Sequence, residues 1–175
     1  MHIRKYNKEV FYLFNVGDKI VYPSQGVGVI DLIESKEFKG KMQNYYKIHL
    51  FNSSMKLMVP FSVVEPSHIR LVSDKDEIDN IFNHIDEFLD IDYDSIPNNF
   101  RERIALNTEK IKSGTLTDCI QVICNLSKIN SKHHLNNVEK QMLTSTKKIL
   151  IEEICQSKNL SNTEAEELLN ASITF

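Results

Sequence analysis

The spacing of apolar residues changes near residue 73, and this change restricts the fold class more than any other feature. Before it, apolar and polar side chains alternate, as they do around Tyr46 and Ile48. After it, apolar residues recur three and four positions apart, as Ile78, Ile81 and Ile85 do. Alternation is the period of a half-buried strand, and the longer spacing is that of an amphipathic helix. We therefore expect an α+β protein with strands first and helices after them.

Residues 16–72 are predicted to form five short strands. The polar runs 39–41 and 52–54 have the composition of tight turns between them. Two of the five glycines of the chain, Gly26 and Gly28, lie in the first pair of strands, where they permit a bend or a bulge. Five strands and tight turns in so short a segment favour a small bent sheet or barrel.

Residues 73–175 are predicted to form a compact all-helical region. Ser73 is suited to begin the first helix as its N-cap, and Gly114 is suited to end a later one. Two capping boxes are predicted, formed by Asn136 with Glu139 and by Ser161 with Glu164. The apolar stripe of the helix that follows Asn136 is predicted to consist of Val138, Met142, Ile149, Leu150 and Ile154.

The net charge of −3 conceals four segments of alternating sign. Residues 1–72 and residues 98–158 each carry ten Lys and Arg against six Asp and Glu. Residues 73–97 carry one against nine, and residues 159–175 carry none against three. The simpler interpretation is a set of solvated surfaces of different sign. The sharper one is a basic helical face that meets a polyanion, with acidic neighbours that limit non-specific adhesion.

The sequence predicts a cytoplasmic protein that does not contact membranes. No apolar run approaches the roughly 18–20 residues of a membrane span, and the basic, then apolar start lacks a signal-peptide cleavage site. Cys119, Cys124 and Cys155 are odd in number and lie in apolar helical patterns. They are predicted to be buried thiols and not a disulfide framework or a zinc site.

No catalytic constellation is recognisable. The chain has no phosphate-binding glycine loop with a lysine, no nucleophile elbow and no HExxH motif. His133 and His134 are adjacent but lack a third ligand, and the acidic run 76–94 lacks the glycine of a calcium loop and is predicted to be an amphipathic helix. We therefore expect a binding protein and not an enzyme, with no metal, cofactor or small-molecule substrate.

One candidate interaction segment is the strand within residues 53–62. If Leu57 and Val59 face the core, then Lys56 and Met58 face outward. An open sheet edge with this pattern could extend the sheet of a partner protein. The pattern alone, however, favours a strand that is buried on both faces.

The second candidate segment begins a predicted basic helix at Phe100, beside Arg101 and Arg103. Taken alone, Phe100 is best explained as a core residue. The alternative is an apolar wedge flanked by arginines, which can unstack DNA at a groove. Lys140 and Lys147 fall on one face of a later helix and would attract phosphates of any sequence.

Several of these segments resemble a known family. "VGDKIVYPSQGVGVIDLIE", "YYKIHL" and "MKLMVP" resemble the N-terminal RNA-polymerase-interacting domain of the CarD/CdnL family of bacterial transcription regulators, a module that also occurs in the transcription-repair coupling factor. "NFRERIALNTEKIKSG" and "LNNVEKQMLTSTKKIL" resemble the helical DNA-binding domain of that family. The resemblance covers residues 14–157. It implies a Tudor-like β domain at residues 1–72 and a helical DNA-binding domain at residues 73–175.

The resemblance also implies partners and contact residues. The β domain would bind the β subunit of RNA polymerase, through Lys36, Lys56, Met58 and Pro60. The helical domain would contact promoter DNA at the upstream edge of the transcription bubble, mostly without regard to sequence. The implied DNA-contacting residues are Phe100, Arg101, Arg103, Lys140, Lys147 and Lys148. Phe100 stands where the family has a tryptophan wedge, so the ring here is smaller and lacks the indole N–H donor.

Together these implications predict a transcription regulator that modulates the stability of the open complex. The alternative is an adaptor of RNA polymerase without a DNA wedge, in which Phe100 is buried and the basic helices are solvated or bind another protein. The exposure of Phe100 separates the two. A general nucleic-acid binder that uses the sheet is less favoured, because Tyr45 and Tyr46 are the few aromatic residues there that could stack on bases.

Overall fold

The computed structural model describes residues 13–90, 92 and 95–174. The sequence suggests an extra strand or a packing arm for residues 1–13, and all of these except Leu13 lie outside the described residues. The strands are β1 (Lys19–Tyr22), β2 (Gly26–Phe38), β3 (Lys41–Leu50), β4 (Lys56–Pro60) and β5 (Arg70–Leu71). The helices are α1 (Phe61–Val64), α2 (Lys75–Asn83), α3 (Asp86–Leu89), α4 (Phe100–Ser113), α5 (Leu116–Lys132), α6 (Asn137–Lys158) and α7 (Asn162–Ser172).

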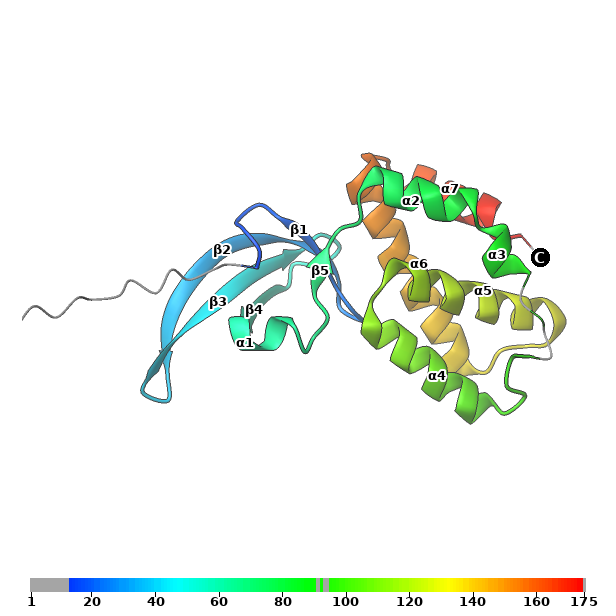
Figure 1. The fold of residues 1–175 in the computed structure, drawn as a ribbon, viewed down its shortest axis with the longest axis horizontal. Coiled ribbons are helices and arrows are strands. Elements are labelled where there is room, and N and C mark those ends of the chain that lie inside the picture. Colours follow the sequence, from blue (N-terminus) through cyan, green and yellow to red (C-terminus); the bar gives the residue numbers. More distant parts are fainter. Residues whose placement is uncertain (1–12, 91, 93–94, 175) are drawn as a thin grey trace, which may run out of the picture.

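The five strands form one bent antiparallel sheet in the order β4-β3-β2-β1-β5. The short helix α1 lies against the sheet, and helices α2 to α7 gather at one end of it (Figure 1). The predicted α+β fold, with a five-stranded bent sheet followed by a helical region, is confirmed. β2 and β3 form a long hairpin that extends away from the helices (Figure 1). Its turn lies at Lys39 and Gly40, within the turn that the sequence predicts at residues 39–41. Both residues have positive φ.

The sequence predicts a bend or bulge at Gly26 and Gly28, but the bulge lies a few residues further along β2. The register of β2 against β3 shifts between Ile30 and Leu32, so that Asp31 is the extra residue. Gly28 has a different role, because a Cβ atom there would overlap the backbone carbonyl of His49 on β3. The glycine therefore lets the two strands approach closely.

The sheet and the helices have separate apolar cores, and we refer to residues 13–72 as the sheet module and to residues 73–174 as the helical module. The sheet core consists of Phe14, Ile20, Ile30, Tyr46, Ile48, Leu50, Val59, Val64 and Ile69. The largest fully buried members of the main helical core are Ile78, Ile120, Ile123, Leu150, Ile154 and Leu169. Each module therefore buries apolar surface independently. The boundary between residues 72 and 73 stays a prediction.

Most helix ends agree with the sequence prediction. Both predicted capping boxes are present, and Gly114 ends α4 in the left-handed conformation with φ 67°. The exception is the start of α2, where the side chain of Asp74 and not that of Ser73 caps the helix, accepting from Glu77 N. Ser73 is instead buried, and its N–H donates to the carboxylate of Glu153.

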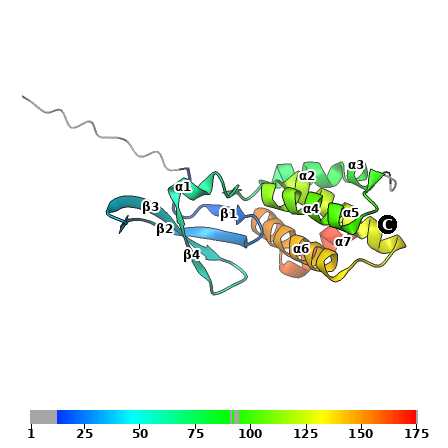
Figure 2. The ribbon, with the colours of Figure 1, turned by 90° about the horizontal axis from the view of Figure 1, so that it is seen from below.

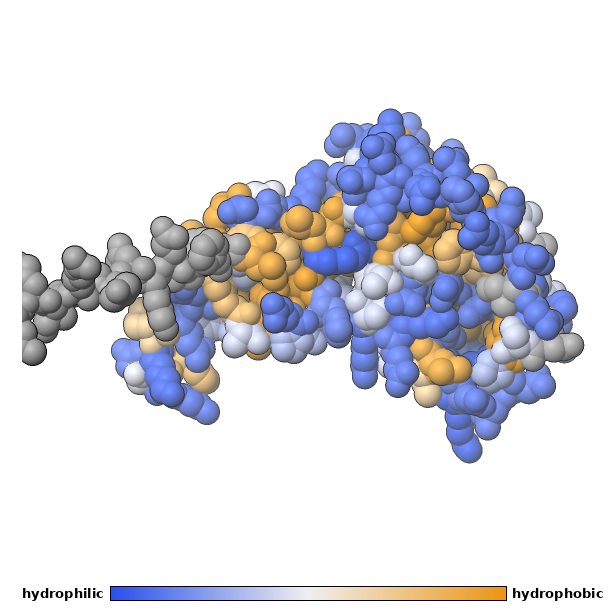
Figure 3. All heavy atoms as spheres, viewed as in Figure 1, coloured by the Kyte–Doolittle hydropathy of each residue, from blue (hydrophilic) through white to orange (hydrophobic). Residues whose placement is uncertain are grey.

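Two predicted helical features are wrong in detail. The acidic run is not one amphipathic helix, because α2 ends at Asn83 and α3 begins only at Asp86. The stripe of α6 does not begin at Val138, which is 51% exposed, while the neighbouring Glu139 is buried. Figure 3 shows that hydrophilic side chains cover the side of the helical module formed by α2 and α7.

The three cysteines are free thiols, of which Cys119 and Cys124 are buried and Cys155 is partly buried. Burial raises the pKa of Cys119 to about 11 and that of Cys124 to about 12. Both groups therefore stay protonated and unreactive near neutral pH. No helix in the described part of the chain is both long enough and apolar enough to cross a membrane.

The two modules are joined by a buried ion pair between β5 and α6. Arg70 donates from Nη1 to Glu153 Oε1 at 2.5 Å and from Nη2 to Oε2 at 2.9 Å. Its Nε donates to the carbonyl oxygen of Gly114 at 2.7 Å, and Ser73 N donates to Glu153 Oε1 at 3.0 Å. The side chain of Glu153 is 2% exposed, so both of its oxygens are satisfied by this contact between modules.

The C-terminal end of α4 completes the interface between the modules. Pro23, in the turn between β1 and β2, packs directly against Gly114, where a Cβ atom would overlap the proline ring. Lys19 Nζ donates to the carbonyl oxygen of Gln156 on α6 at 3.3 Å. Gly114 is therefore required both for the left-handed helix end and for the close approach of the two modules.

Alanine substitutions of Gly114 and Gly40 distinguish the cost of the left-handed conformation from the cost of the overlap with Pro23. Gly114→Ala should lower the free energy of unfolding by about 2–4 kcal/mol, because a left-handed alanine and an overlap with Pro23 add together. Gly40→Ala is the matched control, since Gly40 also has positive φ but no atom lies within 4 Å of its added Cβ. It should cost only about 1 kcal/mol. Urea unfolding measures both, and equal losses would contradict the packing role of Gly114.

Candidate functional site

Phe100 is the first residue of α4, and its side chain projects into solvent. Its neighbour Asn99 is the N-cap, whose side chain accepts from Arg101 N at 2.9 Å. Phe100 is 47% exposed, and the guanidinium carbon of Arg101 lies 5.5 Å from the centroid of its ring. An exposed phenylalanine next to an exposed arginine is the arrangement that an apolar wedge in a nucleic acid requires. The interpretation of Phe100 as a core residue is therefore wrong.

Arg103 has a different environment from Arg101. Its Nε donates to Glu139 Oε1 at 2.8 Å, and its Nη1 donates to the carbonyl oxygens of Pro97 and Asn98 at 2.9 and 2.8 Å. The side chain of Arg103 is only 13% exposed and that of Glu139 only 1%. Arg103 thus fixes the loop before Phe100 to the start of α6. We name this set of contacts the Arg103 clamp.

The carboxylate of Glu139 is shared between the clamp and the helix cap. One oxygen accepts from Arg103, and the other accepts from Asn136 N in the capping box, at 3.2 Å. A buried carboxylate is stable only when it is paired and hydrogen-bonded in this way. The clamp therefore holds the N-terminal ends of α4 and α6 together.

The predicted lysines lie along α6, which packs beside α4 (Figure 2). Lys140 is exposed and directly follows Glu139, so that it shares one end of the helical module with Phe100 and Arg101. Lys148 is exposed about two turns further along α6. Lys147 is partly buried and donates to Asn170 of α7 at 3.3 Å. The structure therefore brings Phe100, Arg101 and Lys140 to one end of the module.

The four residues predicted to contact polymerase lie on or near one edge of the sheet. β4 is the edge strand and carries Lys56, Met58 and Pro60. Met58 is exposed, and Lys36 of β2 reaches across the sheet so that its Nζ lies 3.5 Å from Met58 Sδ. The same Nζ lies 3.0 Å from Glu34 Oε1. The prediction that this strand is buried on both faces is wrong, because Lys56 and Met58 are exposed and β4 pairs only with β3 in the part of the chain that the structure describes.

Sequence reasoning missed the two glutamates that organise the site. Glu139 and Glu153 lie in a helix of mixed charge, and an acidic residue is expected at the surface. The capping box identified Glu139 as a helix-start residue but gave no sign of its burial or of its arginine partner. Their partners Arg103 and Arg70 lie 36 and 83 residues away, so no local pattern could join them.

Glu139 and Glu164 occupy equivalent positions in two capping boxes, but among the described residues only Glu139 has an arginine partner. Glu139→Gln should keep the box and remove the charge, which lowers the free energy of unfolding by about 2–3 kcal/mol. Glu164→Gln should cost less than about 1 kcal/mol, because Glu164 is exposed. Urea unfolding at neutral pH measures both variants. Similar losses in the two would show that the Arg103 clamp adds nothing beyond the cap.

Comparison with known proteins agrees with this arrangement of modules. The profile "CarD-like/TRCF RID domain" matches residues 14–73, and the profile "CarD, C-terminal domain" matches residues 84–170. The Bacillus subtilis (strain 168) protein named "Putative transcription factor YdeB" is 37% identical over 142 residues, which cover 81% of this chain and 90% of that protein. Both modules and their order are thus shared with one group of proteins, and the chain belongs to the CarD family.

Proposed function

We propose that the protein regulates transcription in the cytoplasm by binding RNA polymerase and promoter DNA at the same time. The sheet module binds the β subunit of the polymerase. The helical module contacts DNA at the upstream edge of the transcription bubble and changes the stability of the open complex. The protein performs no chemical reaction. The RID profile over residues 14–73 supports the polymerase part of this proposal.

The exposure of Phe100 is the observation that carries the DNA part. Phe100 is 47% exposed, so its ring leaves apolar area that a partner can cover. Arg101 lies over the ring, and Lys140 lies at the same end of the module. These two cations can pair with phosphates on either side of an inserted ring.

The clamp changes the role that we assign to Arg103. Because its guanidinium is already bound by Glu139 and two carbonyl oxygens, Arg103 is a positioning residue that holds the loop before Phe100. Phosphate contacts are assigned to Arg101, Lys140 and Lys148, which are exposed. Lys147 is a weaker candidate, since it already donates to Asn170.

The edge strand β4 is the proposed polymerase contact. Its outer side lacks a strand neighbour within the described sheet, so its backbone groups can add to a strand of the partner. Lys36, Lys56 and Met58 lie around this edge and would supply charge and apolar area. Pro60 ends the strand and limits the length of the added pairing.

The two contacts reinforce each other because one chain carries both. Docking on the polymerase raises the local concentration of the helical module at the DNA to roughly the mM range, so that weak DNA contacts suffice. Only a preference for parted over closed DNA shifts the equilibrium. A preference of about 1–2 kcal/mol changes the lifetime of the bubble roughly 5–30-fold.

An adaptor without a DNA wedge is the second candidate, and the Arg103 clamp favours it. A cation that the wedge hypothesis would use on DNA is bound inside the module, and Glu102 in the first turn of α4 would repel phosphates. The adaptor expected from the sequence has a buried Phe100, and the exposure of that side chain contradicts this form of it. In the revised adaptor, the exposed ring of Phe100 contacts a protein. The two candidates differ in whether DNA-facing substitutions alter the open complex.

The lifetime of the open complex at a responsive promoter, with polymerase and the full-length chain, tests the proposal. Phe100→Ala should change the effect of the protein on that lifetime by roughly 3–10-fold, because it removes the inserted ring. Phe100→Trp should strengthen the effect, because indole adds area and an N–H donor. Lys140→Glu should weaken it through repulsion of phosphate.

Val138→Ala is the matched control, since Val138 is an equally exposed apolar residue at the start of α6. It should leave the lifetime unchanged. If Phe100→Ala and Lys140→Glu also leave it unchanged while binding to polymerase persists, the adaptor is correct and the wedge is not.

The Arg70–Glu153 pair should determine how well the two contacts cooperate. In the double variant Arg70→Met with Glu153→Met, no buried charge is left unpaired, so both modules should remain folded while their relative orientation loosens. Residual dipolar couplings should then fit two independent alignments. The effect on the open complex should fall several-fold, as for two domains on a flexible tether.

A double variant within the helical module is the control. Lys158 and Asp79 form an ion pair between α6 and α2, so Lys158→Met with Asp79→Asn removes a pair without touching the other module. It should keep a single alignment. A single alignment in the Arg70 and Glu153 variant as well would contradict the role of this pair.

A further inference from the structure

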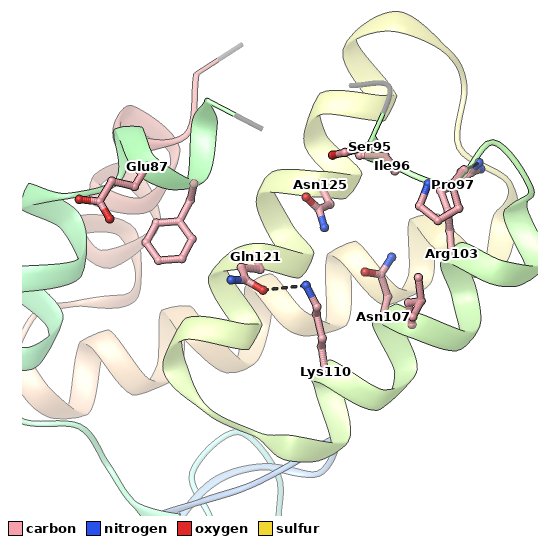
Figure 4. A pocket seen from close by; sticks show the side chains of 11 residues that line it. Glu87, Ser95, Ile96, Pro97, Arg103, Asn107, Lys110, Gln121 and Asn125 are labelled. Atoms are coloured by element: carbon pink, nitrogen blue, oxygen red, sulfur yellow. Dashed lines mark hydrogen bonds between the residues drawn. The ribbon is translucent and has the colours of Figure 1, made fainter. Parts of the chain in front are cut away.

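A cavity of about 420 Å³ lies between α3, α4 and α5, beside the Arg103 clamp, and the proposed function gives it no role. Its size is within the range of pockets that hold small ligands. Figure 4 shows Asn107 and Lys110 of α4 facing Gln121 and Asn125 of α5 across this space. Phe88 of α3 also lines it. The cavity thus combines side-chain amides, a cation and an aromatic ring.

One of these amides has an unused hydrogen-bonding group. Asn125 Oδ1 is buried and has no partner among the described residues. Asn107, which also lines the cavity, is only 5% exposed. Lys110 Nζ, by contrast, donates to Gln121 Oε1 at 2.7 Å and fixes that amide in place. Buried polar groups normally have partners, so the unpaired Asn125 Oδ1 points to a polar molecule that occupies the cavity.

The chemistry of the lining narrows the class of that molecule. A carboxamide presents a donor and an acceptor side by side, which matches the adjacent donor and acceptor on the edge of a nucleobase. An aromatic ring such as that of Phe88 can stack on the base. The ammonium of Lys110 can balance a phosphate group.

We propose that this cavity binds a nucleobase, with Asn107 and Asn125 on its edge and Lys110 near its phosphate. The base comes either from a parted DNA strand or from a free mononucleotide. The DNA source rests on the proposed function. The location of the cavity favours this source, because Pro97 and Arg103, which flank Phe100 in the sequence, also line the cavity. A base freed beside the wedge would then lie near its entrance.

NMR of the ¹⁵N-labelled full-length chain tests this proposal through the side-chain amide signals of Asn107 and Asn125. The probes are the four nucleoside monophosphates, a short single-stranded oligonucleotide and the same oligonucleotide with one abasic position. At least one probe should shift both amide signals. Asn107→Leu should weaken that binding at least tenfold, because an apolar side chain cannot pair with the base edge.

Asn130→Leu is the matched control, since Asn130 is an exposed amide on α5 outside the cavity, and it should leave binding unchanged. Thermal unfolding checks that each variant folds, and Asn125→Leu replaces Asn107→Leu if the latter does not. Lys110→Met should weaken binding of a monophosphate but not of the corresponding nucleoside.

The probes separate the two sources of the base. Shifts with the monophosphates support a free nucleotide, whereas shifts with the oligonucleotide that are lost at the abasic position support a DNA base. The proposal is overturned if no probe shifts the two amide signals, or if Asn107→Leu and Asn130→Leu bind equally well. The open-complex lifetime with Phe100→Ala tests the proposed function independently of this titration. The proposed function can therefore hold even if the cavity binds no base.

Discussion

The contact between Arg70 and Glu153 determines how the two parts of this protein are placed relative to each other. β5 ends at Leu71 and α2 begins at Lys75, so the chain itself offers only a short connection. The buried, bidentate pair turns that connection into a defined orientation. Burial acts to lower the pKa of Arg70, but the hydrogen bonds and charge of Glu153 outweigh it and raise that pKa. Arg70 therefore stays protonated at any physiological pH.

A second buried pair repeats this arrangement at the other end of α6. Glu139 and Glu153 are 14 positions apart, which corresponds to nearly four helical turns and places them on nearly the same face of the helix. Glu139 holds the start of α4 through Arg103, and Glu153 holds β5 through Arg70. The helix α6 thus connects the end of the module that carries Phe100 to the sheet that carries the β4 edge. An unpaired buried carboxylate is so costly that each glutamate selects one geometry.

This arrangement bears on how the two contacts of the proposed function would be coupled. The exposed ring of Phe100 and the exposed edge of β4 are features of separate modules. Their relative positions are fixed by side chains to which the proposal assigns no partner contact. A fixed orientation reduces the entropy lost when both contacts form at once. Part of the entropy loss then occurs on folding and not on binding, which is the advantage of preorganisation.

Local patterns in the sequence determined the class and order of the elements. The change of period near residue 73 predicted strands and then helices, and the capping boxes and Gly114 located helix ends correctly. These features depend on neighbours within four residues, which a sequence displays directly. The resemblance of the segments further indicated the CarD family, to which the chain belongs.

Only the tertiary structure decided which polar residues are buried and which apolar ones are exposed. Glu139 and Val138 are adjacent, yet the acid is buried and the valine is exposed, because an arginine 36 residues away reaches the acid. The same contact gave Arg103 a positioning role, although by sequence it is equivalent to Arg101. Burial of a charge depends on a partner that folding brings close, and residues next to it in the sequence carry no information about that partner.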